Sequence, residues 1–502
     1  MRMRYLPDGN WIKRADTHTI QDIGIPSVVL MERAALKVVE FLEQKNINTE
    51  KTLVVCGSGN NGGDGFAVAR LLSAEGKEVT VLFAGKESSM TEDCVLQAKI
   101  AQNQGVTIVT ELPRDEYNVI IDAIFGVGLS REVSGHYAGL IQQMNRMSGI
   151  KIAIDIPSGI CSGTGKVLGC AFRADITVTF QCEKLGMAWF PGTEYSGEIT
   201  VAEIGIDTGI FCDNQEISYT LDSLDLPGML PVRIKNSHKG TYGKLLMITG
   251  SKGMAGAAFL SAQAAYTAGA GLVRIYTDES NRSILQQLIP EAVVSTYTGY
   301  NEQELRELLE WADVVCIGCG LGKSEVSAKL LEQTLKWADV PCIIDADGIN
   351  LLSMKPQLLT ERNTPTILTP HMKEMSGLIG CSVAELSERR LEILRQFTGT
   401  YPAVCVLKDA RTIVAEDNRQ YFINTAGNQA MAKAGAGDVL AGLIAGFSAQ
   451  KMGAYDSAVL GVFLHALAGD EAKRQMGSYS VLAEDLIRCA GICLKNAEEE
   501  RK

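Results

Sequence analysis

The sequence predicts an α/β protein with two domains. Short β-branched runs alternate with amphipathic segments along two long stretches of the chain, as in parallel sheets whose strands are joined by helices. An aperiodic segment with two prolines and two glycines, at 221–240, separates the two stretches. With 502 residues, the chain is also too long for one compact domain. We therefore expect one domain over residues 1–221 and a second over 226–499.

The first stretch predicts a parallel sheet with connecting helices. Its apolar runs give the expected strands 52–56, 78–83, 118–123, 151–156 and 175–180. Helices fit at 66–75 and 91–104. An opening helix should begin at Pro26, because the fixed φ of proline suits a first helical turn.

The second stretch repeats the alternation, but no repeat relates it to the first, so we expect a different fold. Its expected strands are 244–249, 272–276, 314–317, 341–345, 366–369 and 403–407. Two helices should close the chain, from about Asp438 and from about Tyr455. The uncharged run 253–273 contains polar residues and several glycines, and predicts a loop and a buried Ala-rich helix rather than a membrane span.

Composition narrows the possible partners and the compartment. The net charge is −12, so the chain lacks the basic footprint that nucleic acid requires, although small anions can still bind at helix N-termini. Thirteen cysteines, an odd number spread through apolar runs, indicate reduced thiols. The pair Cys316 and Cys319 has no second pair or nearby histidine and does not predict zinc. No signal peptide or membrane segment is visible, and we expect a cytoplasmic protein.

The first expected strand is followed by a glycine-rich loop, GSGNNGGDG, at 57–65, and then by a helix. Its glycines match G-x-G-x-x-G, the turn that approaches a dinucleotide pyrophosphate, but such rows also serve packing alone. The acid that should follow about twenty residues later is missing, because Glu87 lies thirty residues from Gly57. This spacing disfavours a conventional dehydrogenase.

Polar residues at three strand ends suggest a ligand site. Asn60, Asn61 and Asp64 share one turn, while Asp122 and Asp155 with Ser158 follow two other strands. Ligands of open α/β sheets bind at the carboxyl ends of the strands, and these oxygens would suit a hard cation. Alternatively, each aspartate caps a loop or a helix.

Three motifs, NNGGDG at 60–65, D-x-x-F-G-x-G at 122–128 and DIPSG at 155–159, together resemble the NAD(P)H-hydrate epimerase domain over residues 1–220. The resemblance implies a Rossmann-like three-layer αβα fold that binds hydrated NAD(P)H and a potassium ion. Asn61, Asp122 and Ser158 would ligate potassium, and Asp155 would be catalytic. The implied substrate-binding residues are Asn60, Asn61, Gly62, Gly63, Asp64, Gly126, Val127, Gly128, Leu129, Ser130, Arg131, Glu132, Tyr137 and Asp155. Related domains also serve as non-catalytic scaffolds, an alternative that the intact Asn61, Asp122 and Asp155 disfavour.

The second domain contains the strongest motif, NQAMAKAGAGDVLAG at 428–442. A turn with Gly435 and Gly437 precedes a helix, so free N–H groups should form an anion site. Asp438 either caps this helix or accepts a proton from a hydroxyl beside that site. No Walker P-loop is present, because GCGLGKS has the wrong spacing. KDART, Lys408 to Thr412, offers a cation and a hydroxyl to phosphate instead.

GAGD resembles the ribokinase-like superfamily, and a set of six motifs that includes it narrows the resemblance to ADP- or ATP-dependent NAD(P)H-hydrate dehydratase over about 226–499. They are GTYGK, GSKGMAGAA, GCGLG, DADG, TPHMKE and AGAGD. The resemblance places Ala257, Gly322, His371 and Asp438 at the hydrated nucleotide, with Asp438 as the general base. It places Lys408, Asp409, Ala410, Arg411, Thr412 and Gly437 at ADP. Asp409 stands where the family pattern has glycine.

The two resemblances together imply a bifunctional repair enzyme. Its first domain would interconvert the R and S hydrates of NADH and NADPH, which carry water at C6 of the nicotinamide. Its second domain would use ADP or ATP, with magnesium, to dehydrate the S form; with ADP the products would be NAD(P)H, AMP and phosphate. We also expect a homo-oligomer without nucleic-acid or membrane partners. The alternative is a ribokinase-type vitamin-precursor kinase with a non-catalytic first domain.

Overall fold

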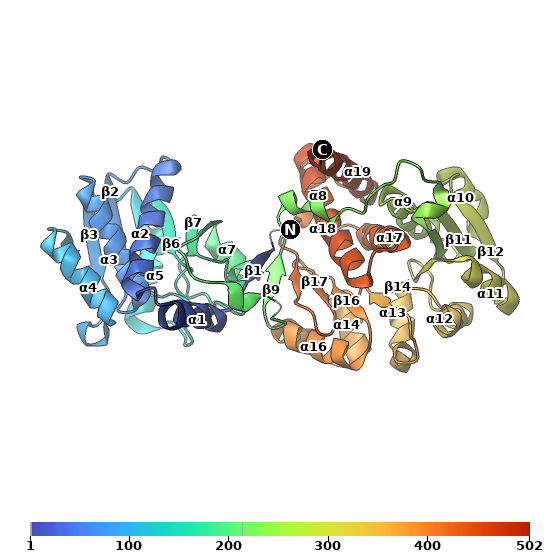
Figure 1. Cartoon of the computed structure of the whole chain (residues 1–502), viewed down its shortest axis with the longest axis horizontal. Helices are drawn as coiled ribbons and strands as arrows, with labels where there is room; N and C mark the ends of the chain where they lie inside the picture. The colour runs from blue at the N-terminus through green and yellow to red at the C-terminus, as the bar shows by residue number, and fades with distance from the viewer. Residues whose placement is uncertain (1–2, 213, 502) are drawn as a thin grey trace. The chain divides into compact units, whose positions relative to one another are not determined.

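The computed structural model describes residues 3–212 and 214–501, which form two compact α/β units. One unit spans Arg4–Tyr219, and the other is built from Thr220 onward (Figure 1). Within the described residues, no helix combines the length and the apolar character that crossing a membrane requires.

The first unit is a three-layer αβα structure around a parallel sheet in the strand order β4-β3-β2-β5-β6-β7-β8. The strands are β2 Lys51–Cys56, β3 Glu78–Phe83, β4 Thr107–Val109, β5 Val119–Ala123, β6 Ile150–Ile154, β7 Ile176–Phe180 and β8 Glu198–Ala202; β1 Arg4–Leu6 and β9 Ser218–Thr220 lie near its ends in sequence. Because parallel strands are buried on both faces, β2 and β5 are almost continuously apolar.

Helices cover both faces of this sheet. They are α1 Gly9–His18, α2 Ser27–Gln44, α3 Asn60–Ala74, α4 Glu92–Asn103, α5 Gly135–Arg146, α6 Leu185–Ala188 and α7 Gly192–Ser196. Helices α2, α3 and α4 pack side by side, and their apolar side chains form one core with the sheet (Figure 1). Helix α5 packs Leu140, Ile141 and Met144 into a second core.

The structure confirms the predicted α/β class of this unit and its five strands to within two residues. One prediction was wrong: 57–65 is not all loop, because helix α3 begins at Asn60 and includes NNGGDG. The glycines had suggested a loop, but Gly62 and Gly63 are buried within the helix. The opening helix begins at Ser27 with Pro26 as its N-cap, and α1 precedes it. The short edge strands β4 and β8 were not predicted.

The second unit contains a sheet in the order β18-β17-β16-β15-β14-β13-β10-β11-β12. Its strands are parallel from β16 to β12, while β17 and β18 are antiparallel. The bounds are β10 Lys244–Ile248, β11 Leu272–Asp278, β12 Val293–Tyr297, β13 Val314–Ile317, β14 Cys342–Ile344, β15 Thr366–Leu368, β16 Val404–Leu407, β17 Ile413–Ala415 and β18 Phe422–Ile423. The six predicted strands are present, and β12, β17 and β18 are additional.

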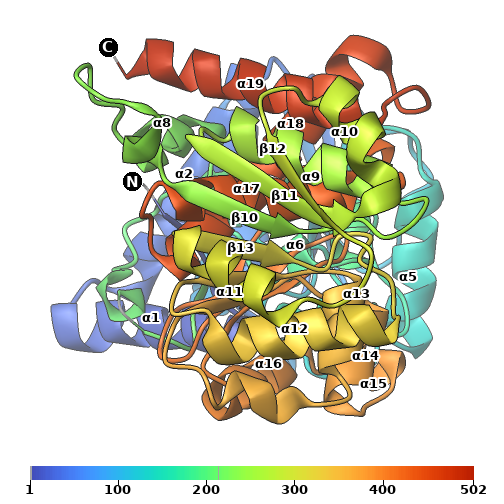
Figure 2. The same cartoon turned by 90° about the vertical axis from the view of Figure 1, so that its right-hand side faces the viewer.

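Helices α9, α17 and α18 cover one face of this sheet, and α11, α12 and α16 cover the other (Figure 2). The helices are α8 Leu226–Met229, α9 Ala255–Thr267, α10 Arg282–Leu288, α11 Glu302–Trp311, α12 Glu325–Trp337, α13 Asp347–Leu352, α14 Met372–Ile379, α15 Val383–Glu388, α16 Arg390–Thr400, α17 Ala436–Ala449, α18 Ala454–Met476 and α19 Ala483–Glu500. The prediction of two closing helices was wrong, because α19 follows α17 and α18 and packs on α18.

Helices α9 and α17 approach closely because both are rich in small residues. A Cβ on Gly442 would lie 2.1 Å from the Ser261 carbonyl oxygen of α9. We expect Gly442→Ala to destabilise this unit by about 1–3 kcal/mol, because the helices must separate. The exposed Gly377 of α14 has no neighbour within 4 Å of its Cβ position, so Gly377→Ala should be neutral or stabilising. Urea unfolding followed by circular dichroism tests both, and equal effects would contradict the packing argument.

Candidate active sites

A cavity of about 930 Å³ in the first unit lies where the strand order reverses, between β2 and β5. Ligands of open α/β sheets bind at such a reversal, because the loops leaving its two strands diverge to opposite faces. Most sequence-predicted residues line it: Asn60, Asn61, Asp64, Gly126, Val127, Gly128, Leu129, Ser130, Arg131, Tyr137 and Asp155. Gly62, Gly63 and Glu132 do not.

The glycines before and within the first turn of α3 let neighbouring backbone and side chains pack closely against it. A Cβ on Gly57 would lie 2.1 Å from the Ile124 carbonyl oxygen, and one on Gly62 would lie 2.0 Å from the Gly57 carbonyl oxygen. Gly63 packs against Met31 in the same way. These contacts bring the start of α3 against the end of β5, and so bring Asn61 close to Gly126.

Asp122, at the end of β5, joins two of the loops around the cavity. Its carboxylate accepts hydrogen bonds from the Ser158 backbone N–H and hydroxyl, both at 2.7 Å, and from the Ile124 N–H at 3.2 Å. Burial raises the pKa of Asp122 to about 6, although the Ser158 hydrogen bonds oppose this rise. No basic side chain of the described residues forms an ion pair with it. Nearby, the buried Asn61 Nδ2 has no hydrogen-bond partner.

Asp155 is held by a buried lysine. Its backbone has a φ of +68°, and its N–H donates to the Val178 carbonyl at 2.8 Å. Lys184, which is fully buried, donates from Nζ to the Asp155 carboxylate, to the Thr179 hydroxyl at 2.8 Å and to the Phe180 carbonyl at 2.9 Å. Thr179 and Phe180 belong to β7, and Asp155 lies beside it. Lys184 therefore fixes the orientation of the Asp155 carboxylate toward the cavity.

Further acids line the cavity beside this pair. Burial, followed by the charges of Asp155, Asp16 and Asp93, raises the pKa of Asp64 well above its ordinary value. Burial and the same neighbours also raise the pKa of Asp16. Sequence reasoning missed Lys184 and Asp16; a lysine four residues after the end of strand β7 was the available signal for the first.

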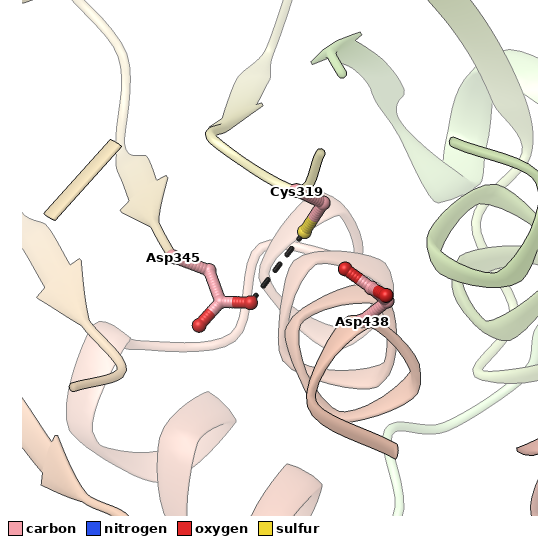
Figure 3. Close-up of side chains that lie close together, drawn as sticks. All are labelled: Cys319, Asp345 and Asp438. Carbon is pink, nitrogen blue, oxygen red and sulfur yellow. Dashed lines mark hydrogen bonds between the residues drawn. The ribbon is translucent and has the colours of Figure 1, made fainter. Parts of the chain in front are cut away.

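The second unit brings Cys319, Asp345 and Asp438 together at the ends of β13 and β14 and the start of α17, next to the reversal of strand order between β10 and β13 (Figure 3). One ligand atom from each lies within 4.8 Å of the others. Asp345 follows β14 and is 1% exposed, and the Cys319 Sγ lies 3.6 Å from its Oδ2. Asp345 was missed as a site residue, although an acid directly after a strand was the signal used in the first unit.

Lys408 forms the ion pair of this site. Its Nζ donates to Asp345 Oδ1 at 2.7 Å, and Thr369 donates to the same oxygen at 2.6 Å. Burial, followed by the charge of Asp345, raises the pKa of Asp438 to about 7, while Cys319 and Lys408 oppose the rise. Asp438 therefore changes charge near neutral pH, as a general base must.

The N-terminus of α17 adjoins this cluster. Gly435 is its N-cap, with a φ of +90°, and no side chain caps the helix, so Asp438 is not the cap that the alternative interpretation required. The Lys408 Nζ lies 3.5 Å from the Cβ position of Gly437. A lysine beside uncapped N–H groups is suited to bind phosphate.

The loop after β13 forms another wall. Gly318 must be glycine, because its φ is +124° and a Cβ would lie 2.0 Å from the Asp345 carbonyl oxygen. Ala257 of α9 packs against Gly320, and the Gly322 N–H donates to Asp347 at 2.9 Å. Of the predicted residues, Ala257 thus contacts the loop that carries Cys319, and Gly322 is part of that loop.

Other residues that the sequence predicts to bind ligands make structural contacts. His371 is the N-cap of α14, where its Nδ1 accepts from the Lys373 and Glu374 N–H groups at 3.1 Å; its binding role stays a prediction. Asp409 accepts from Arg390 at 3.3 Å. Asp409 stands where the family pattern has glycine, and this ion pair gives its carboxylate a partner within the segment predicted to bind ADP. Arg411 donates to the Thr425 carbonyl, and the Thr412 hydroxyl to the Asp409 carbonyl.

Both units match models of known protein families. Residues 245–490 match the model described as NAD(P)H-hydrate dehydratase. Residues 27–186 match the model of the YjeF-related protein N-terminus.

Whole-length relatives carry both units. The chain is 37% identical to a bifunctional NAD(P)H-hydrate repair enzyme of Moorella thermoacetica, over 99% of this chain and 98% of that protein. It is 35% identical to the enzyme of that name in Escherichia coli, over 95% and 91%. A ribokinase-like superfamily protein from Enterococcus faecalis, solved as a crystal structure, is 30% identical, with a TM-score of 0.50 over 55% of this chain and 95% of that chain. This likeness gives the second unit a ribokinase-like fold.

The contribution of the hydrogen bonds between Asp122 and Ser158 to the stability of the first unit can be tested. We expect Ser158→Ala to lower the free energy of unfolding of the first unit by about 1–3 kcal/mol, because a buried carboxylate loses a hydroxyl donor. Ser162→Ala is a matched control nearby, because its hydroxyl makes one bond, to the Val127 carbonyl at 3.2 Å, and should cost about 1 kcal/mol or less. If urea titrations give equal losses, Ser158 is not the main support of Asp122.

Proposed function

Because the chain belongs to the family of bifunctional NAD(P)H-hydrate repair enzymes, we propose that each of its units carries out one step of that repair. The first unit epimerises the R and S hydrates, and the second dehydrates the S hydrate with ADP or ATP. The fusion is chemically sensible, because a stereospecific dehydratase alone would leave the R form unrepaired.

The observation that carries the dehydratase assignment is the placement of Asp438. Its carboxyl is half-buried at the uncapped start of α17, beside the Asp345–Lys408 pair. In the proposed reaction, Asp438 takes the proton of the 6-hydroxyl as this oxygen attacks the terminal phosphate of the nucleotide. The α17 N–H groups and Lys408 stabilise the charge on that phosphate. Elimination of the phosphorylated oxygen then restores the reduced nicotinamide.

Epimerisation is assigned to the cavity of the first unit. Its volume of about 930 Å³ suits a dinucleotide, and its polar groups converge on the reversal of strand order. Asn60, Asn61, Asp64, Tyr137 and the loop from Gly126 to Arg131 would hold the hydrate, with Asp155 at the reacting ring.

The residues proposed for potassium fit a cation. Asp122 is a fully buried carboxylate that no basic side chain among residues 3–212 and 214–501 pairs with, and the Asn61 amide is not fixed through its Nδ2. Oxygen atoms of Asn61, Asp122 and Ser158 would hold the ion, as the hard donors that such cations prefer. A bound cation would balance the Asp122 charge beside the cavity.

The Cys319–Asp345–Asp438 group does not fit magnesium. A hydrogen bond with Cys316 and burial raise the pKa of the Cys319 thiol well above its ordinary value, and Asp345 is already paired with Lys408. Magnesium prefers oxygen ligands. We therefore assign no step to a metal held by these residues.

The repair function is favoured over the kinase alternative by the relatives reported above. We also propose a cytoplasmic location, supported by thirteen cysteines that are all unpaired, because such thiols suit a reducing compartment.

The decisive test uses mixed R and S hydrates of NADH with ADP or ATP, followed by absorbance of the reduced nicotinamide. We expect Asp438→Asn to slow NADH regeneration by about 10²–10⁴-fold, because the general base is lost, while the epimers still equilibrate. In the unmodified chain the dehydration rate should rise with pH through about 7, where Asp438 loses its proton. Asp155→Ala should clear only the S form. Normal dehydration by Asp438→Asn, read with chiral chromatography, would contradict the assignment.

The potassium proposal has its own test. Epimerisation by the unmodified chain should depend on potassium, and Asp122→Ala should weaken that dependence, because the proposed site loses its only charged ligand. Dehydration of pure S hydrate should be unchanged in the same variant. An epimerisation rate indifferent to potassium in the unmodified chain would remove the ion from the proposal.

A further inference from the structure

We propose that Asp64 and Asp155 are an acid–base pair for epimerisation, with Lys184 as the positioning residue that keeps Asp155 in the basic role. This inference deepens the proposed epimerase function and rests on it. It assigns a proton-transfer role to Asp64 and a function to Lys184, which the sequence did not single out.

The geometry gives the two carboxyl groups different surroundings. Both line the same cavity, Asp64 from the second turn of α3 and Asp155 from the turn after β6. Asp155 is in contact with the fully buried Lys184 ammonium, and the Phe180 N–H points at it from 3.4 Å. Within the described residues, no hydrogen bond or ion pair holds the Asp64 carboxyl.

Three of the four charged groups that face Asp64 favour this division. Asp16 on α1, Asp93 on α4 and Asp155 disfavour a second negative charge there, and only Lys184 opposes them. Burial raises the pKa of the Cys56 and Cys94 thiols, which also face Asp64, so they stay neutral and leave its protonation undisturbed. Two carboxyl groups with such different surroundings in one cavity are suited to act as acid and base.

The pair can exchange the two faces of C6 without another reactant. Asp64 gives its proton to the 6-hydroxyl, the C6–O bond breaks with its electrons on oxygen, and water leaves. The lone pair of the ring nitrogen forms a C6=N bond, so the ring becomes a cation, which the carboxylates of the cavity stabilise. Water then adds to the opposite face and gives a proton to Asp155. That proton returns to Asp64 through solvent, and the reverse direction exchanges the two roles.

The experiment uses the full chain and pure R hydrate of NADH with excess ADP, or ATP if that is the active nucleotide. NADH then appears only after epimerisation. Pure S hydrate reports dehydration separately. We expect Asp64→Asn to lower kcat for the R hydrate by about 10²–10⁴-fold with KM little changed, because the amide keeps the shape and cannot supply the proton. Glu75→Gln, an exposed carboxyl-to-amide change just after the same helix, is the matched control.

The pH profile separates proton transfer from a structural role. With the R hydrate, the rate of the unmodified chain should fall at high pH, where Asp64 loses its proton. Asp64→Asn should lack the alkaline limb, and Asp64→Glu should restore it with part of the rate. Lys184→Met should lower kcat for the R hydrate with KM little changed and leave dehydration of the S hydrate unaltered, because Asp155 loses the contact that orients its carboxylate.

The outcomes distinguish this inference from the function on which it rests. If the unmodified chain clears S hydrate but clears R hydrate no faster than buffer does, the epimerase function itself fails. If the unmodified chain clears both and Asp64→Asn matches it on R hydrate, or keeps the alkaline limb, the acid role of Asp64 is overturned. If Lys184→Met keeps the kcat of the unmodified chain on R hydrate, Lys184 does not act through Asp155.

Discussion

Both candidate sites depend on one constraint, the parallel direction of the strands in the two sheets. Parallel strands all end at the same edge, and where the strand order reverses the adjoining loops separate and leave a crevice. The reversal lies between β2 and β5 in the first unit and between β10 and β13 in the second. The glycines after those strands let the backbone approach closely there. Gly57 packs against Ile124, and Gly318 packs against Asp345.

Buried carboxylates have a similar arrangement of charged partners in the two units, although the folds of the units differ. In each, a lysine after a strand forms an ion pair with one aspartate: Lys184 with Asp155, and Lys408 with Asp345. In each, a second aspartate at the start of a helix stays without a full counter-charge, and its pKa is raised. The ion pair satisfies a charge whose burial would otherwise be costly, while burial makes the second acid hold its proton more tightly than an exposed aspartate does.

This arrangement also explains why the same residue type has several roles. Asp122 holds the Ser158 loop, and Asp345 holds Lys408, whereas Asp64 and Asp438 have few fixed partners. The hydrogen bonds of Asp122 hold its loop in place, and few fixed partners leave the carboxyls of Asp64 and Asp438 available to a substrate. The surroundings of each aspartate, rather than the residue type, therefore decide its role.

The sequence by itself determined the α/β class, the predicted strands of each unit and the acids at strand ends. Those features follow from local periodicity and from residues adjacent in the chain. It misjudged 57–65 as loop, because glycines that a helix uses for close packing look the same as glycines that form a turn. The edge strands β4 and β8 and the antiparallel pair β17 and β18 escaped prediction, because their pairing depends on neighbours distant in sequence.

Only the tertiary structure decided which charges meet. Lys184 lies 29 residues from Asp155, and Lys408 lies 63 residues from Asp345, so neither pair has a local signal. The raised pKa values of Asp64 and Asp438 arise first from burial, which exists only after the sheet and helices have packed. Sequence fixes which acids are available, whereas their ionisation depends on desolvation and on charges brought together by the fold.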